Sequence, residues 1–479
     1  MKRWYLILTW LVVFVAIIFR FYRFSSRWGL AFDQAHDALI AREALRIKKI
    51  PLLGTFASGA NIVYGPQWYW WLTFCTFLFP RLVISPWIGL VILSIFCVFL
   101  MIKIGEEVGD RKLGLILGIL TAFSPLQISQ SVNLTNQGPM SLITAICLWS
   151  LIKYIKSGKP IFAFILGTGI GVGINIHFQG LGLIFLTLPF FIYGERSLIA
   201  LLLFSLGFFF QFLPLLVFEL KTNFYNLAGV LNYLLYERYK TGISQNWFNY
   251  IFSLWPDLWR KIAGGNKFTA VLQWLLVGFF LFRGLLKKKI SKLFLAVLLG
   301  FFLIFISLRY YQGPHFESYY VFIHPFVLFL SAWLVWQIYQ RKKSLGVILL
   351  IILLATSLKL SLNHYRVERN GIYPLVKDWE RKLIRLFPGK KFAVYDYRSL
   401  TKDKTASLSL VLETDNLIDD EGIKIGISRC DLLPKFTPLI KNGYCVYDLS
   451  RVKKENDDWQ FLNPSEIWKA TEEWYYNIK

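Results

Sequence analysis

Charged residues are scarce in this sequence of 479 residues: they make up only 17% of the chain, whereas hydrophobic residues make up 56%. A mean hydropathy of +0.49 is too high for a soluble protein of this length. Cysteine is rare as well, with five residues, and the sequence has no zinc-binding spacing, no phosphate-binding glycine loop and no internal repeat. These absences leave a polytopic membrane protein as the predicted class.

Acidic residues are fewer than basic ones, 29 against 53, so the net charge is +24. Such a charge can indicate nucleic-acid binding. Here many lysines and arginines lie between the hydrophobic runs, where such residues set membrane topology and contact anionic lipid headgroups. We therefore expect the lipid bilayer, and no nucleic acid, as a partner.

The apolar runs predict an α-helical protein with about 11 transmembrane helices, since a helix of about 17 to 25 residues spans a bilayer. The first run is followed by arginines instead of a small-residue cleavage site, so we expect it to be retained. The expected spans are Tyr5–Phe21, Val83–Ile102, Leu113–Ile128, Gly138–Ile155, Ile161–Ile176, Leu181–Tyr193, Leu198–Phe218, Val271–Leu286, Leu293–Leu308, Tyr320–Ile338 and Leu345–Leu362.

Basic loops stay in the cytoplasm, and their positions are consistent with an inside amino terminus only if Gln67–Phe79 does not cross the membrane. That segment is short, aromatic and bounded by prolines, which favours an interfacial helix in the first extracytoplasmic loop. The loops expected outside are 23–82, the turn near Asn133, 219–270, 309–319 and everything after Ser361.

The charged tail predicts a second domain, so that residues 1–362 form the transmembrane domain and residues 363–479 a small extracytoplasmic α/β domain. Strands are expected at Phe392–Tyr397, Lys424–Ser428 and Tyr444–Leu449, and an amphipathic helix at Tyr373–Leu386. The tail contains Cys430 and Cys445. An extracytoplasmic location permits a disulfide between them, and two buried thiols are the equal alternative.

Two motifs in the first loop carry the clearest functional signal. Asp33-Gln34-x-His36-x-Ala38-x-x-Ala41-Arg42-Glu43 is followed by Tyr64-Gly65-Pro66-x-x-Tyr69-Trp70, and later by Ser124-Pro125 and by Tyr319-Tyr320 with Pro325. This order resembles the GT-C membrane glycosyltransferases, especially the branch of the lipid A aminoarabinose transferases and protein O-mannosyltransferases, over roughly residues 1 to 340. The resemblance implies a GT-C fold and inverting transfer of a sugar from a polyprenyl-phosphate donor to a hydroxyl acceptor on a lipid, glycan or protein.

Asp33 is the predicted general base, because a hydroxyl group becomes a good nucleophile only when a positioned carboxylate takes its proton. The departing phosphate needs no general acid, so one carboxylate suffices. Asp33 could also serve as the N-cap of the helix that follows, and the two roles are compatible. Asp37 lies one turn further along the same helix face and is the alternative base.

The motif departs from the family pattern at several positions. Gln34 replaces the second acid of a pair, His36 stands where the aminoarabinose branch has arginine, and Tyr64 or Gly65 stands where it has lysine. Other groups must then hold the donor phosphate. The candidates are Arg309, His315, His36 and His177; the expected substrate-binding residues are Tyr64, Gln67, Tyr69, Trp70, Gln34, Tyr319 and Tyr320.

Each candidate also has a structural interpretation: the histidines as hydrogen-bonded residues, Arg309 as a snorkelling cation, and Trp68 to Trp71 as an interfacial aromatic belt. No metal ligands are predicted and no cofactor is required, although a divalent cation is compatible with the chemistry. The plasma membrane is the expected location, with the active site and the tail outside. A lipid or polysaccharide flippase and a noncatalytic membrane assembly protein are the alternative functions.

Overall fold

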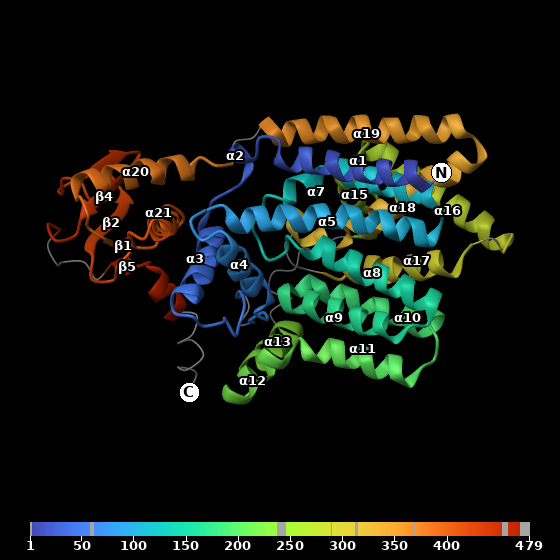
Figure 1. Ribbon diagram of the computed structural model, residues 1–479, viewed down its shortest axis with the longest axis horizontal. Coiled ribbons are helices and arrows are strands. Elements are labelled where there is room, and N and C mark those ends of the chain that lie inside the picture. Colours follow the sequence, from blue (N-terminus) through green and yellow to red (C-terminus); the bar gives the residue numbers. More distant parts are fainter. Residues whose placement is uncertain are drawn as a thin grey trace.

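The chain forms a bundle of long apolar helices with a smaller α/β domain at one end (Figure 1). The computed structural model describes residues 2–57, 62–236, 246–288, 290–311, 315–366, 369–452 and 458–469. In Figure 1 most bundle helices lie nearly side by side along the long axis of the molecule, and the α/β domain packs beyond their ends. This separation agrees with the change in composition along the sequence.

The bundle helices are rich in Leu, Ile, Val and Phe, as expected for helices that keep their backbone hydrogen bonds within a lipid bilayer. They are α1 (Lys2–Phe21), α5 (Ser85–Val108), α6 (Arg111–Phe123), α8 (Met140–Ser157), α9 (Pro160–Ile176), the 3-10 helix η1 (Phe178–Leu186) with α10 (Thr187–Tyr193), α11 (Leu198–Phe210), α12 (Leu213–Lys221), α16 (Lys267–Leu286), α17 (Lys292–Leu308), the 3-10 helix η4 (Glu317–Ile323) with α18 (His324–Arg341), and α19 (Lys343–Arg366). Within the described residues, six helices are long and apolar enough to span a membrane, and α11 with α12 would make a seventh. Three shorter apolar helices accompany them: α9, η1 with α10, and α17.

Two predicted spans are not continuous helices. The run Leu113–Ile128 breaks because Pro125 has no backbone N–H to donate; α6 ends at Phe123 and α7 (Pro125–Gln130) begins anew, capped by Ser124. The run Leu198–Phe218 divides into α11 and α12, which meet at an angle of 55° just before Pro214. The prediction of a single helix was wrong at both places.

Shorter helices lie between these long ones. They are α2 (Phe24–Arg27), α3 (Phe32–Arg46) and α4 (Gln67–Leu78) after α1, and α13 (Tyr225–Leu235), α14 (Trp247–Asn249), the π-helical turn η3 (Tyr250–Leu254) and α15 (Trp255–Ala263) before α16. The predicted helix at Gln67–Phe79 corresponds to α4, which packs against α3 and α5. The first loop therefore contributes two packed helices that border the bundle.

Two buried arginines hold the end of α1 against its neighbours. Arg20 donates hydrogen bonds to Ser94 Oγ and to backbone carbonyls of α1 and α6. Arg27 donates to the carbonyls of Phe19, Arg20 and Tyr22, and to the carbonyl of Ile128. Most of these carbonyls lie in or just after the last turns of α1, α6 and α7, where few backbone N–H groups remain to pair with them. The two guanidinium groups therefore act as hydrogen-bond donors to helix ends, and within the described residues neither forms an ion pair.

The α/β domain combines a five-stranded sheet with α-helices, and residues 464–469 are also helical. Its elements are α20 (Ile372–Leu386), β1 (Phe392–Tyr397), α21 (Lys402–Thr414), β2 (Ile423–Arg429), β3 (Ile440–Asn442), β4 (Tyr444–Asp448) and β5 (Trp459–Phe461). The strand order is β3-β4-β2-β1-β5. β1 and β2 are parallel, and the other pairs are antiparallel. The predicted strands and amphipathic helix are confirmed, whereas α21 was not predicted.

The two cysteines of this domain form a disulfide. Cys430 follows β2, Cys445 lies in the adjacent β4, and their Cα atoms are 5.0 Å apart. The other three cysteines are buried free thiols. The structure therefore favours the disulfide over the alternative of two buried thiols.

Candidate active site

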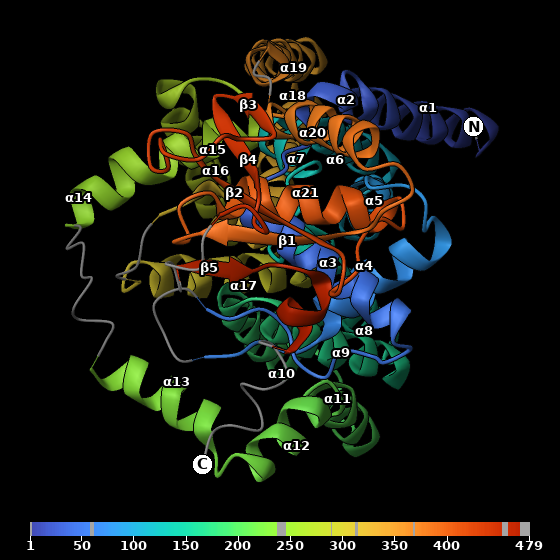
Figure 2. The same ribbon diagram turned by 90° about the vertical axis from the view of Figure 1, so that its left-hand side faces the viewer.

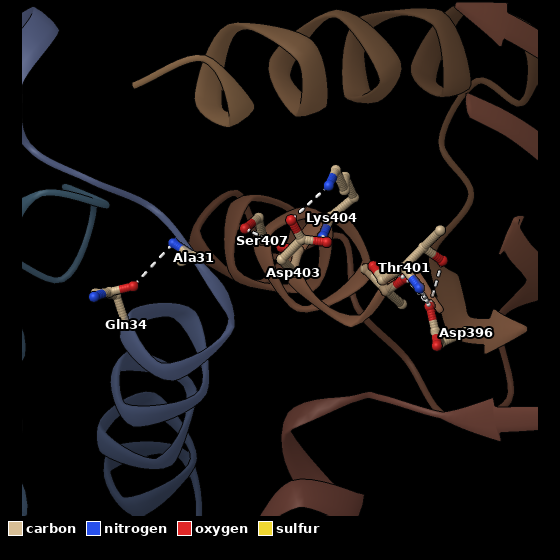
Figure 3. A network of polar contacts seen from close by, with 8 residues as sticks. Ala31, Gln34, Asp396, Thr401, Asp403, Lys404 and Ser407 are labelled. Carbon is tan, nitrogen blue, oxygen red and sulfur yellow. Dashed lines mark hydrogen bonds and ion pairs between the residues drawn. The ribbon is translucent and has the colours of Figure 1, made fainter. Parts of the chain in front are cut away.

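The first turn of α3 presents the carboxylate of Asp33. The helix begins at Phe32, and the Gln34 side chain accepts a hydrogen bond from the Ala31 N–H at 3.0 Å (Figure 3). The expectation that Asp33 is the N-cap was wrong, because Asp33 lies inside the first turn and Ala31 occupies the cap position. The Gln34 side chain therefore caps the amino-terminal end of α3, and Asp33 has no capping role.

The carboxylate of Asp37, one turn later, is occupied by structural hydrogen bonds. Asp37 is only 5% exposed. It accepts from Trp68 Nε1 at 2.8 Å and from the Tyr69 hydroxyl at 3.2 Å, and the His36 ring lies 3.3 Å away. These bonds join α3 to α4. The two aspartates share a helix face but have different environments.

Asp33 is exposed, and in the described part of the chain no group donates a hydrogen bond to its carboxylate. Partial burial by surrounding atoms raises the pKa of Asp33; the negative charge of Asp37 adds to this effect, and His36 opposes it. The Tyr319 hydroxyl lies within electrostatic range of Asp33. A carboxylate with a raised pKa and no bound partner is chemically suited to accept a proton.

Three aromatic rings from distant segments meet in a cluster that includes Tyr319, the residue within electrostatic range of Asp33. The Tyr64 ring stacks on His177 with centroids 5.5 Å apart, and His177 lies 5.2 Å from the ring of Tyr319. Tyr64 comes from the first loop, His177 from the turn between α9 and η1, and Tyr319 from η4. The structure thus brings together three predicted site residues that are far apart in the sequence.

Two further polar residues belong to this cluster and were missed by sequence reasoning. The Tyr311 hydroxyl and the Gln179 side chain are hydrogen-bonded to each other, and Tyr311 interacts electrostatically with Tyr64 and Tyr319. Burial raises the pKa of Tyr311. Tyr311 lies in a loop and Gln179 in the first turn of η1, and the spacing Asn175-x-His177-x-Gln179 was the signal of a polar turn between apolar helices.

The backbone around Tyr64 is fixed by close packing against the end of α9. The N–H of Gly65 donates to the carbonyl of Asn175 at 2.8 Å, and the Tyr64 N–H donates to the carbonyl of Thr55 at 3.0 Å. A Cβ atom on Gly65 would lie 2.2 Å from Asn175 Oδ1 and 2.7 Å from Asn175 Cβ. Only glycine fits there without displacing Asn175.

We therefore expect Gly65→Ala to destabilise the protein by about 1 to 3 kcal/mol, the usual cost of overpacking. Thermal melting in detergent measures the change. Gly278→Ala is the matched control, because nothing lies within 4 Å of a Cβ atom at that position of α16. Equal melting temperatures for the two variants would contradict the packing argument.

Other predicted substrate-binding residues make defined local contacts. Gln67 Nε2 donates to the carbonyl of Gln211 at 2.9 Å, while its Oε1 is buried and has no hydrogen-bond partner. Trp70 donates to the carbonyl of Pro51 at 2.7 Å. Gln67 therefore joins α4 to the bend between α11 and α12. Trp70 links α4 to Pro51, which lies in the same first loop.

Two of the predicted phosphate-binding residues share the aromatic cluster, because the His315 ring lies 5.7 Å from the ring of Tyr311. His177 belongs to the aromatic cluster, and His36 lies beside Asp37. His315 is hydrogen-bonded through Nδ1 to the Tyr320 hydroxyl, and burial lowers the pKa of His315. Arg309 ends α17 and lies over the Trp247 ring, 5.3 Å from its centroid. Among the residues described, no group of three or more His, Cys, Asp or Glu side chains is placed to hold a metal ion.

Comparisons with known proteins identify the fold. A family model of the dolichyl-phosphate-mannose-protein mannosyltransferases matches residues 64–218. The structure of ArnT from Cupriavidus metallidurans bound to undecaprenyl phosphate is similar with a TM-score of 0.64 and 11% sequence identity, over 91% of this chain and 97% of that chain. Archaeal oligosaccharyltransferase AglB from Archaeoglobus fulgidus, in complex with an inhibitory peptide and a dolichol-phosphate, is similar with a TM-score of 0.56 and 12% identity, over 98% of this chain and 77% of that chain. The chain has the GT-C fold.

The predicted GT-C fold is thereby confirmed, including the helical bundle and the small domain after it. The matched segment of the family model begins at Tyr64 and ends at Phe218. It includes the Tyr64-Gly65-Pro66 motif and the turn with His177, but it begins after Asp33. No sequence among curated proteins matches this chain.

Proposed function

We propose that this GT-C protein transfers a sugar from a polyprenyl-phosphate donor to a hydroxyl acceptor, with Asp33 as the general base. The observation that carries the proposal is the difference between two neighbouring carboxylates: Asp37 is buried and hydrogen-bonded, whereas Asp33 is exposed and free of such bonds. Undecaprenyl phosphate in ArnT and dolichol-phosphate in AglB support a polyprenyl-phosphate carrier.

In the proposed reaction, Asp33 takes the proton of the acceptor hydroxyl as its oxygen attacks the anomeric carbon. The bond between that carbon and the phosphate oxygen breaks, and the polyprenyl phosphate leaves with the electron pair. A single in-line displacement inverts the anomeric carbon. The phosphate is a stable leaving group, so this step needs no protonated side chain opposite Asp33.

The surrounding residues have proposed binding roles. Tyr64, His177 and Tyr319 form an aromatic cluster whose Tyr319 interacts electrostatically with Asp33, and aromatic faces suit the apolar faces of sugar rings. Tyr311 and Gln179 add hydroxyl and amide groups for sugar hydroxyls. Arg309, His315, His36 and His177 remain the proposed contacts of the donor phosphate.

An assay with purified protein tests the activity. We expect wild-type protein in lipid nanodiscs to release undecaprenyl phosphate from undecaprenyl-phosphate-linked sugars when total membrane lipid supplies the acceptor. The measurement is sugar incorporation into the lipid fraction by mass spectrometry. Absence of transfer from pentose and hexose donors alike, with folded protein, would overturn the proposal.

The orientation of the site is a separate proposal: Asp33 and the α/β domain face the outside of the plasma membrane. A cysteine introduced at Lys390, in a background with the three free cysteines changed to serine, is expected to react with a membrane-impermeant maleimide in intact cells. Cys430 and Cys445 are paired and do not compete for the reagent. Labelling only after lysis would reverse the orientation.

A further inference from the structure

The helix α13 lies across the ends of the bundle helices. In Figure 2, α11 is viewed nearly end-on whereas α13 is viewed from the side. Asn226 and Tyr233 lie two turns apart on one face of α13 and are buried or partly buried, whereas the leucines at other positions around the helix are exposed: Leu227, Leu231 and Leu235. α13 is therefore an amphipathic helix with one face turned toward the protein.

The first turn of α13 is fastened to the first loop. The Asn226 side chain accepts a hydrogen bond from the Val63 N–H at 2.7 Å and donates one to the Val63 carbonyl at 3.2 Å. Val63 immediately precedes Tyr64, and Asn226 is only 6% exposed. The Glu219 carboxylate accepts hydrogen bonds from the N–H groups of Asn226 and Leu227. These bonds fix the start of α13 next to a residue of the aromatic cluster.

Two turns further along α13, Tyr233 reaches the aromatic cluster. Its ring lies edge-to-face with the ring of Phe178, with centroids 5.9 Å apart. Its hydroxyl group is within electrostatic range of the hydroxyl groups of Tyr64, Tyr311 and Tyr319. Tyrosines from the first loop, from α13 and from the region around η4 therefore converge at one place.

The neighbours of these tyrosines relate Tyr233 to both ends of the proposed reaction. Tyr319 interacts electrostatically with Asp33, the proposed base. The Tyr311 ring lies 5.7 Å from the ring of His315, a proposed phosphate contact. Tyr233 interacts with both tyrosines. In an in-line displacement the anomeric carbon lies between the attacking oxygen at the base and the departing phosphate, so a residue that interacts with both sides is expected to face the sugar.

Two buried polar atoms of the cluster have no hydrogen-bond partner among the described residues. They are Gln179 Oε1 and His315 Nε2. Buried polar atoms are normally paired, so these two atoms are suited to a ligand that both donates and accepts hydrogen bonds. The Tyr233 hydroxyl can donate and accept as well. Phenol, amide and imidazole groups at one place match a ligand with several hydroxyl groups.

We propose that Tyr233 of α13 binds the transferred sugar through a hydrogen bond with one of its hydroxyl groups, so that α13 forms one wall of the transfer site. The inference rests on the proposed function, since it assigns a further substrate-binding residue to the same site. It gives α13 a direct part in recognition of the donor sugar.

Transfer kinetics of the full-length protein in lipid nanodiscs test the role of Tyr233. The donors are undecaprenyl-phosphate-linked mannose and undecaprenyl-phosphate-linked arabinose, and total membrane lipid supplies the acceptor. We expect Tyr233→Phe to raise KM for the donor about three- to tenfold, the effect of losing one hydrogen bond, and to keep kcat within about twofold of the wild-type value. Tyr236→Phe is the matched control at the end of the same helix, because Tyr236 is 66% exposed, and its KM should equal that of wild type.

Inhibition by undecaprenyl phosphate, which carries no sugar, distinguishes binding of the sugar from binding of the carrier. The inhibition constant of undecaprenyl phosphate should be the same for wild-type protein and for Tyr233→Phe. A rise in this constant equal to the rise in KM would assign Tyr233 to the carrier and overturn the proposed sugar contact.

The remaining outcomes separate the two proposals. If folded wild-type protein transfers neither mannose nor arabinose, the proposed function fails and the role of Tyr233 fails with it. If wild-type protein transfers a sugar and Tyr233→Phe has the wild-type KM, only the role of Tyr233 is overturned. An equal rise of KM in Tyr236→Phe would indicate a general effect on α13 and would also overturn that role. Thermal melting of each variant shows whether the fold is intact.

Discussion

Asp33→Asn is expected to reduce sugar transfer by at least about a hundredfold while the protein stays folded, because a positioned general base contributes about 10²–10⁴ to a rate. Asparagine has nearly the same size and cannot accept the proton. The Asp33 side chain makes no hydrogen bond within the described structure, so its replacement by asparagine breaks no side-chain contact of this kind. The measurement is the initial rate of transfer from a polyprenyl-phosphate-linked sugar, with melting temperature as the check on folding.

The pH dependence adds a second readout for Asp33. Burial and the charge of Asp37 raise the pKa of Asp33, so its carboxylate is the weaker acid and the better base. The base acts when it is deprotonated. A plot of kcat/KM against pH should therefore rise through a midpoint above the ordinary pKa of aspartate and level off at higher pH. An Asp33→Asn variant with undiminished transfer, or with an unchanged acid limb, would show that another group takes the proton.

Much of the fold was predictable because its helices and strands follow simple patterns. Long apolar runs gave the bundle helices, and alternating apolar residues gave β1, β2 and β4. The failures have local causes: Pro125 removes a backbone donor and ends α6, and the chain bends ahead of Pro214. Both prolines were visible in the sequence, but the apolar runs around them are continuous.

The helix α21 was missed for a different reason. Its central residues are buried on every side, between the sheet and α3, so they show no apolar stripe of helical period. The two serines and the threonine among them find backbone and side-chain acceptors inside the protein. Only the tertiary structure reveals that this segment covers the helix of the proposed site.

The site was predictable in part. Asp33, Tyr64 and Tyr319 were identified through a motif and a family resemblance. The structure brings Tyr64 and Tyr319 together through His177, and Tyr319 interacts electrostatically with Asp33. Nothing in the sequence paired Asp37 with Trp68, which are 31 positions apart, because that contact depends on how α3 packs on α4. The sequence therefore suggested two candidate bases, and the packing distinguishes their environments.

Replacement of Asp37 is expected to affect stability more than chemistry. In Asp37→Ala, the Trp68 N–H and the Tyr69 hydroxyl lose the acceptor that each now has in a buried site. The buried Trp68 N–H is then left without an acceptor, which costs about 1 to 3 kcal/mol, so the variant should lose about that much stability. Thermal melting and the yield of folded protein measure this loss.

Asp37→Asn separates the structural role from a catalytic one. The amide oxygen can still accept from Trp68, so this variant should fold and retain transfer within about tenfold of wild type. Loss of the Asp37 charge removes one cause of the raised pKa of Asp33. The acid limb of kcat/KM should therefore move to lower pH, which a purely structural effect would not produce. Folded Asp37→Asn protein without transfer activity would instead identify Asp37 as the base, and the exposed carboxylate one turn earlier would then serve to bind substrate.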